Sequence, residues 1–144
     1  MLLRIQGLRT EWLYLRARVA LASAAGRERK RRLGIAEDLA GRIAKENMPW
    51  SNPFAMLIRA GLAQRGGDAS RAAALLTQAV EGFEAADMSL YAMAARRRLG
   101  ETLSGDRGRE LIGQSDDWMR KQQIKNPSAF SNLLAPGFTE IGQE

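Results

Sequence analysis

The chain has 144 residues, 45% of them apolar, and it contains neither cysteine nor histidine. Disulfides, thiolate or imidazole metal sites, and Ser-His-Asp or Cys-His catalytic groups are therefore excluded. Its 22 basic and 16 acidic residues give a net charge of +6, and 18 of the basic residues are arginine. This excess suits an anionic partner, but it is also common in proteins from GC-rich bacterial genomes, and we favour that compositional interpretation.

The apolar residues are mostly alanine and leucine, which favours helices over strands, and no segment alternates with period two. No apolar run reaches the roughly 18 residues of a membrane span, and the N-terminus lacks the pattern of a signal peptide. We therefore expect a cytoplasmic protein with one all-α domain, no cofactor and no membrane contact.

The first helix is expected to run from about residue 3 to residue 25, where Gly26 ends it. Residues spaced alternately by three and four mark one face of this helix. They are Ile5, Leu8, Trp12, Leu15, Val19 and Ala22. A second apolar stripe begins at Leu13 and Ala17, so the helix is apolar around much of its circumference.

A single neighbouring helix cannot cover both stripes, and the remainder would form an unusually large apolar patch for a monomer. We therefore expect self-association through the N-terminal hairpin, most simply as a two-fold homodimer. The residues proposed for this contact are Trp12, Leu13, Leu15 and Val19.

The second helix is expected to begin within a basic cluster and to end near Asn47. The cluster comprises Arg27, Arg29, Lys30, Arg31 and Arg32. A helix N-terminus disfavours positive charge by roughly 0.3–1 kcal/mol per group. Two interpretations stay open, a solvated connector and a surface that binds nucleic acid or another polyanion. The aromatic residues typical of single-strand binders do not interleave with the cluster, so nucleic acid is the alternative rather than the first choice.

Further helices are expected over about 52–65, 68–86 and 89–103, from Asp106 onward, and from Pro127 to residue 134. Asp68 and Asn126 carry N-cap signals. Glycines near positions 26, 66 and 105 divide the first six helices into three hairpins.

The middle hairpin fits the tetratricopeptide pattern, with small residues where its helices cross. These positions are Ala60, Ala63, Gly67, Ala72, Leu76 and Ala79. We expect a right-handed α-solenoid of about three such hairpins plus a short C-terminal helix, over residues 1–137. Residues 138–144 are expected to form a flexible tail.

The first helices of the three hairpins would line a groove for a protein partner. Arg59, Arg65 and Arg96 are the polar contacts that we propose for it. Arg96, Arg97 and Arg98 fan across about 200° of a helix, so at least one must lie near the packed stripe. A structural or solvated role is therefore favoured over anion recognition for this triplet.

Five segments of the C-terminal half carry a further pattern. They are 81–101, Gly105-Asp106-x-Gly108-Arg109, Asp117-Trp118-Met119, Gln123-Ile124-x-Asn126-Pro127 and 134–138. Together they resemble the C-terminal helical-repeat region of large multidomain bacterial serine/threonine protein kinases. In that family a kinase domain and an ATPase-like module precede tetratricopeptide-type repeats. The chain departs from the family at Ser104 and Gln122, where glycine is more common.

The resemblance implies a non-catalytic scaffold that binds a protein partner or the neighbouring domains of a kinase. The chain itself carries no kinase motif and no phosphate-binding glycine loop. Its paired carboxylates are expected to be solvated: Glu37 with Asp38, Glu81 with Glu84, and Asp116 with Asp117. We therefore expect no enzymatic activity from this chain.

Overall fold

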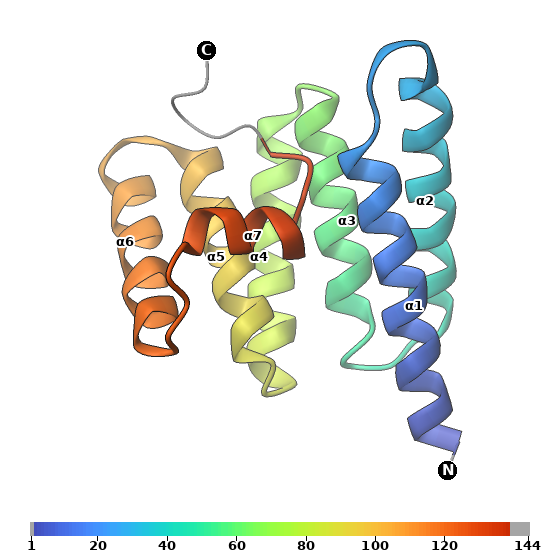
Figure 1. The fold of residues 1–144 in the computed structure, drawn as a ribbon, viewed down its shortest axis with the longest axis horizontal. Helices are drawn as coiled ribbons and strands as arrows, with labels where there is room; N and C mark the ends of the chain where they lie inside the picture. The colour runs from blue at the N-terminus through green and yellow to red at the C-terminus, as the bar shows by residue number, and fades with distance from the viewer. Residues whose placement is uncertain (1, 139–144) are drawn as a thin grey trace.

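The computed structural model describes residues 2–138, and within them it contains seven α helices, one 3-10 turn and no strand. The elements are α1 (Leu2–Ala22), η1 (Gly26–Glu28), α2 (Arg29–Lys45), α3 (Asn52–Arg65), α4 (Ala69–Ala85), α5 (Ser89–Leu103), α6 (Gly105–Lys121) and α7 (Pro127–Leu134). From α1 to α6, each helix packs against the next one in the chain (Figure 1). The predicted all-α class is confirmed, and the sequential packing is consistent with a helical-repeat arrangement.

None of the helices in residues 2–138 combines the length and the hydropathy of a membrane span. The predicted tail lies outside the described residues, except for its first member, Phe138, which is only partly exposed.

Helix starts follow the predicted caps at two places. The Asp68 carboxylate accepts a hydrogen bond of 3.0 Å from the backbone N–H of Arg71 at the start of α4. The Asn126 side chain accepts one, also of 3.0 Å, from the N–H of Ala129 at the start of α7. Each cap satisfies a backbone donor that has no partner within the helix.

A cluster of four aromatic rings joins four helices in the core. Phe54 of α3 lies 4.5 Å from Tyr14 of α1, 5.0 Å from Phe83 of α4 and 4.8 Å from Tyr91 of α5, measured between ring centroids. Most of the remaining core is alanine and leucine, so the helices approach closely around these rings.

α5 and α6 approach each other closely at two glycines. A Cβ atom on Gly100 would lie 2.7 Å from the carbonyl oxygen of Gly108, and both residues are buried. Backbone packs directly on backbone here, so side chains cannot be accommodated without moving the helices apart.

The turn between α5 and α6 contains a strained residue. Ser104 has φ 58° and ψ −169°, a region that only glycine adopts easily. Its backbone N–H donates to the carbonyl of Gly100, and its carbonyl accepts from the N–H of Gly108, so the conformation is fixed by both helices. This is one of the two positions where glycine is more common in the kinase proteins that the sequence resembles. At the other, Gln122 has an ordinary φ of −86°, and the positive φ falls on Gln123.

Ser104→Gly is therefore expected to stabilise the protein by about 1 kcal/mol. Relief of the strain outweighs the greater backbone entropy that glycine brings to the unfolded chain. The midpoint of thermal unfolding should rise by roughly 2–4 °C. Ser104→Ala is the matched control, because it removes the hydroxyl and keeps Cβ. An equal rise in both variants would show that backbone strain is not the cause.

Candidate interaction surface

The C-terminal segment, residues 133–138, lies along α1, α3 and α5, the first helices of the three hairpins. The Tyr14 hydroxyl of α1 donates to the carbonyl of Leu134, and the Arg18 guanidinium donates to the carbonyl of Leu133 at 2.8 Å. On α3, a Cβ at Gly61 would lie 2.9 Å from the carbonyl oxygen of Pro136. In Figure 1, α7 crosses in front of α5, and the chain then turns toward α3 and α1. The helices predicted to line a groove thus already hold a segment of the same chain.

Arg98 of α5 fastens this segment. Its side chain is completely buried, and its Nε donates to the carbonyl of Ala135 at 2.8 Å. One terminal nitrogen binds the Glu101 carboxylate at 2.7 Å, and the other donates to the side-chain oxygen of Asn132. The guanidinium also lies 5.3 Å from the centre of the Phe138 ring. Of the structural and solvated roles expected for the arginine triplet, Arg98 has the structural one, and it is enclosed rather than extended toward solvent as predicted.

Arg97 extends the same network to α6. Its side chain pairs with the Glu101 carboxylate and, at 2.8 Å, with Asp116. The side chains of Arg97 and Asp116 are 11% and 17% exposed, so the prediction of a solvated Asp116 is wrong. This carboxylate is a structural partner of an arginine.

The hydroxyl of Tyr14 is held in its neutral form. Burial raises the pKa of Tyr14 far above its ordinary value, an effect that nearby Arg18 only partly offsets. The phenol therefore remains a hydrogen-bond donor to Leu134 at physiological pH. Burial also raises the pKa of Tyr91.

The three arginines proposed as groove contacts hold other helices. Arg59 pairs with Glu37 of α2 at 3.1 Å, and Arg96 pairs with Glu84 of α4. Arg65 donates to the carbonyls of Ala24 and Leu21 near the end of α1, at 3.2 and 3.4 Å. None of these bonds reaches the C-terminal segment, and each connects one helix to another.

One face of α1 is uncovered. Five large apolar side chains on it are between 43% and 64% exposed. They are Ile5, Leu8, Trp12, Leu15 and Val19, and we call this set the α1 stripe. The prediction that part of α1 stays exposed is confirmed for these residues. Leu13 is a correction to the proposed self-association surface, because it is only 2% exposed and belongs to the core with Ala17.

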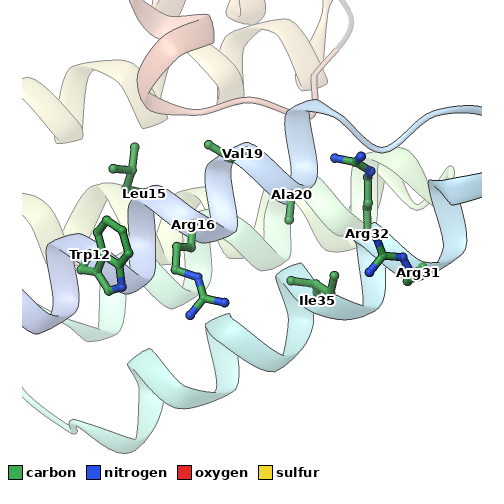
Figure 2. Close-up of a pocket in the computed structure, with 8 residues that line it drawn as sticks. All are labelled: Trp12, Leu15, Arg16, Val19, Ala20, Arg31, Arg32 and Ile35. Carbon is green, nitrogen blue, oxygen red and sulfur yellow. The ribbon is translucent and has the colours of Figure 1, made fainter.

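Two hollows flank the α1 stripe and share Trp12 and Leu15. The first has a volume of about 340 Å³ and lies between α1 and α2, where Val19, Ile35 and Arg32 also line it (Figure 2). The second has a volume of about 460 Å³, and its lining includes Arg18 and Tyr91. Arg16 and Arg18 were absent from the predicted sites. Their positions beside the alternating three-and-four stripe were the signal that could have identified them.

The basic cluster at the start of α2 is mostly engaged with its surroundings. Arg29 donates to the carbonyl of Arg65 at 2.7 Å, Arg31 pairs with Glu28, and Arg32 donates to the hydroxyl of Ser23. The Arg31 pair lowers the pKa of Glu28 through its hydrogen bond and charge. Arg31 and Arg32 also line the hollow between α1 and α2, so the cluster borders the α1 stripe.

Comparison with protein-family models, with curated proteins and with solved structures finds no match to this chain. The assignment of function therefore depends on the geometry described above and on the sequence motifs.

Leu13→Glu and Leu15→Glu are expected to differ in stability, because Leu13 lies on the buried side of α1 and Leu15 on the exposed side. Leu13→Glu places a charge in the core and should cost about 3–5 kcal/mol, enough to unfold much of a marginally stable domain. Leu15→Glu should change stability by no more than about 0.5 kcal/mol, because that side chain is partly solvated. Urea unfolding followed by circular dichroism measures both. An equal loss in the free energy of unfolding in both variants would contradict the assignment of Leu13 to the buried side and Leu15 to the exposed side.

Proposed function

We propose that the chain is a non-catalytic protein-interaction module, built as a right-handed α-solenoid of three tetratricopeptide-like hairpins. One observation carries the proposal: the α1 stripe leaves five large apolar side chains uncovered on one helix of an otherwise well-packed domain. Exposed apolar surface of this size on a soluble domain is typical of protein–protein contacts. Trp12 lies at its centre, and tryptophan is enriched among the residues that dominate binding energy.

The partner surface in this proposal is not the predicted groove. The segment from Leu133 to Phe138 already lies on α1, α3 and α5, through buried hydrogen bonds from Tyr14 and Arg98. Displacing it would remove the Ala135 carbonyl from the buried Arg98 guanidinium and leave Glu101 of α5 as its charge partner. Loss of a buried hydrogen bond to a charged group is costly. The α1 stripe requires no such displacement.

The sequence resemblance supports a role in a bacterial serine/threonine kinase signalling protein. Its motifs coincide with the structural network of the C-terminal half: Arg97 joins α5 to α6 through Asp116, Arg98 joins α5 to α7, and Gly108 meets Gly100. In this proposal the chain ends or accompanies such a kinase and binds a neighbouring domain or a separate protein through α1.

Binding of nucleic acid or another polyanion through Arg27, Arg29, Lys30, Arg31 and Arg32 is the second candidate. The net charge of the first 65 residues favours it, with 13 basic residues against 5 acidic ones. Arg29, Arg31 and Arg32 already make bonds within the chain, which leaves them less available to a polyanion. We therefore favour the protein-binding role.

Site-specific photo-crosslinking in cells tests the proposal. A photoreactive amino acid at Leu15 should give a covalent adduct with another polypeptide, identified by mass spectrometry. The same group at the exposed residue Gln114 of α6 is the matched control and should give none. No polypeptide adduct at position 15, or adducts with nucleic acid alone, would contradict the protein-binding function.

A further inference from the structure

We infer that the α1 stripe binds an amphipathic helix with acidic flanks from a different polypeptide. The apolar side of that helix would cover Leu8, Trp12, Leu15 and Val19, and its carboxylates would face the arginines that border the stripe. This inference rests on the proposed function and specifies the chemistry of the partner.

The spacing of the α1 stripe selects a helix as the occupant. Its members alternate by three and four residues from Ile5 to Val19, which is the seam that one helix presents to another in a coiled coil. The stripe spans about 20 Å along α1, or roughly four turns. The hollow between α1 and α2 continues it sideways, because Ile35 and the edge of α2 form its opposite wall (Figure 2). A helix lying along α1 would therefore meet apolar surface on two sides.

The charges that border the stripe select an acidic partner. Residues beside the seam of α1 include Arg4, Arg9, Arg16 and Arg18, while Glu11 is the one acidic residue of the helix. Arg9 is paired with Glu46, but Arg16 makes no hydrogen bond or ion pair within residues 2–138. Figure 2 shows the Arg16 side chain over the hollow between α1 and α2, with Arg31 and Arg32 at its far end. This hollow is thus lined by three arginines and no acidic residue, whereas Glu11 lies beside Arg18 in the second hollow.

Two buried donors on these walls lack partners. The Nε atoms of Arg18 and Arg32 are enclosed by protein and make no hydrogen bond among the described residues. Arg18 lines the hollow beside Tyr91, and Arg32 lines the hollow beside Ile35. An unpaired buried donor on a charged group is costly, and a carboxylate is the acceptor that pairs best with a guanidinium. Arg18 and Arg32 thus bring incompletely hydrogen-bonded guanidinium groups to the two hollows, one on each side of the stripe, which matches a helix with acidic residues on both flanks.

A second copy of the chain fits this surface less well. It would bring the same arginines to the contact, with Glu11 of each copy as the acidic residue that α1 offers in return. Like charges brought together across an interface are destabilising. A single-stranded nucleic acid would match the arginines but leave the aliphatic side chains uncovered, since Trp12 is the sole aromatic residue of the stripe.

Binding of two designed peptides tests the inference. Both are 21-residue helices with leucine at the seam positions, and they differ only at the flanking positions, which are glutamate in one and lysine in the other. Fluorescence anisotropy of the labelled peptides with the full chain should show at least about tenfold tighter binding of the glutamate peptide at low salt, from several weak ion pairs acting together. The preference should shrink at high salt, as screening requires.

Variants locate the contact. Val19→Glu should weaken binding of the glutamate peptide by at least about tenfold. Leu103→Glu, which alters an exposed apolar residue outside the stripe, should leave that binding unchanged. Arg16→Glu should reduce the preference for the glutamate peptide, and Arg120→Glu on α6 is its charge-matched control. Circular dichroism confirms that each variant is folded.

Several results would overturn the inference. One is equal binding of the two peptides, and another is equal loss of binding in Val19→Glu and Leu103→Glu. A dimer at tens of micromolar in sedimentation equilibrium that Val19→Glu converts to a monomer would make a second copy the occupant. Displacement of the peptide by a single-stranded oligonucleotide would assign the surface to nucleic acid. Polypeptide adducts at position 15 together with no peptide preference would leave the proposed function standing and refute the acidic chemistry alone.

Discussion

The buried guanidinium of Arg98 is the interaction on which the arrangement of the C-terminal half depends. A charge removed from water must be paired and hydrogen-bonded, or it strongly destabilises the fold. Arg98 meets this requirement through the Glu101 carboxylate, the Asn132 side chain and the carbonyl of Ala135. Two of these three partners, Asn132 and Ala135, belong to α7 and the residue that follows it. The buried guanidinium on α5 therefore has all of its partners only when α7 and the residues after it are in place.

Fixing that segment determines which surface is left for a partner. Residues 133–138 lie on α1, α3 and α5, where Tyr14, Arg18 and Arg98 bind them. The face that was predicted to bind a partner is therefore already occupied by the same chain. The uncovered apolar side chains are then concentrated on α1, at the opposite end of the helix array from α6 (Figure 1). With that face occupied, the α1 stripe is the uncovered apolar surface that we propose for a partner.

Local signals in the sequence predicted the helices well, because caps and glycines act within a few residues. Asp68 and Asn126 cap α4 and α7 as expected. The side of α1 that is buried was harder to predict, since both stripes are apolar and only tertiary packing selects Leu13 over Leu15. The partners of Arg98 could not be predicted at all: Asn132 and Ala135 are more than 30 residues away, and a bond to a backbone carbonyl leaves no residue-type signal. The unpaired Nε atoms of Arg18 and Arg32 likewise depend on tertiary packing.

Amide hydrogen exchange in α7 tests most directly whether the buried Arg98 guanidinium holds α7 in place. In the native chain the N–H groups of Phe130 and Ala135, which bond to the carbonyls of Asn126 and Ser131, should be protected to a similar degree as those of α5. In Arg98→Met, which keeps most of the buried stem, protection should fall in α7 while α3 and α4 keep theirs. Exchange of α7 at the rate of an unstructured peptide in the native chain, or unchanged protection in Arg98→Met, would contradict the account.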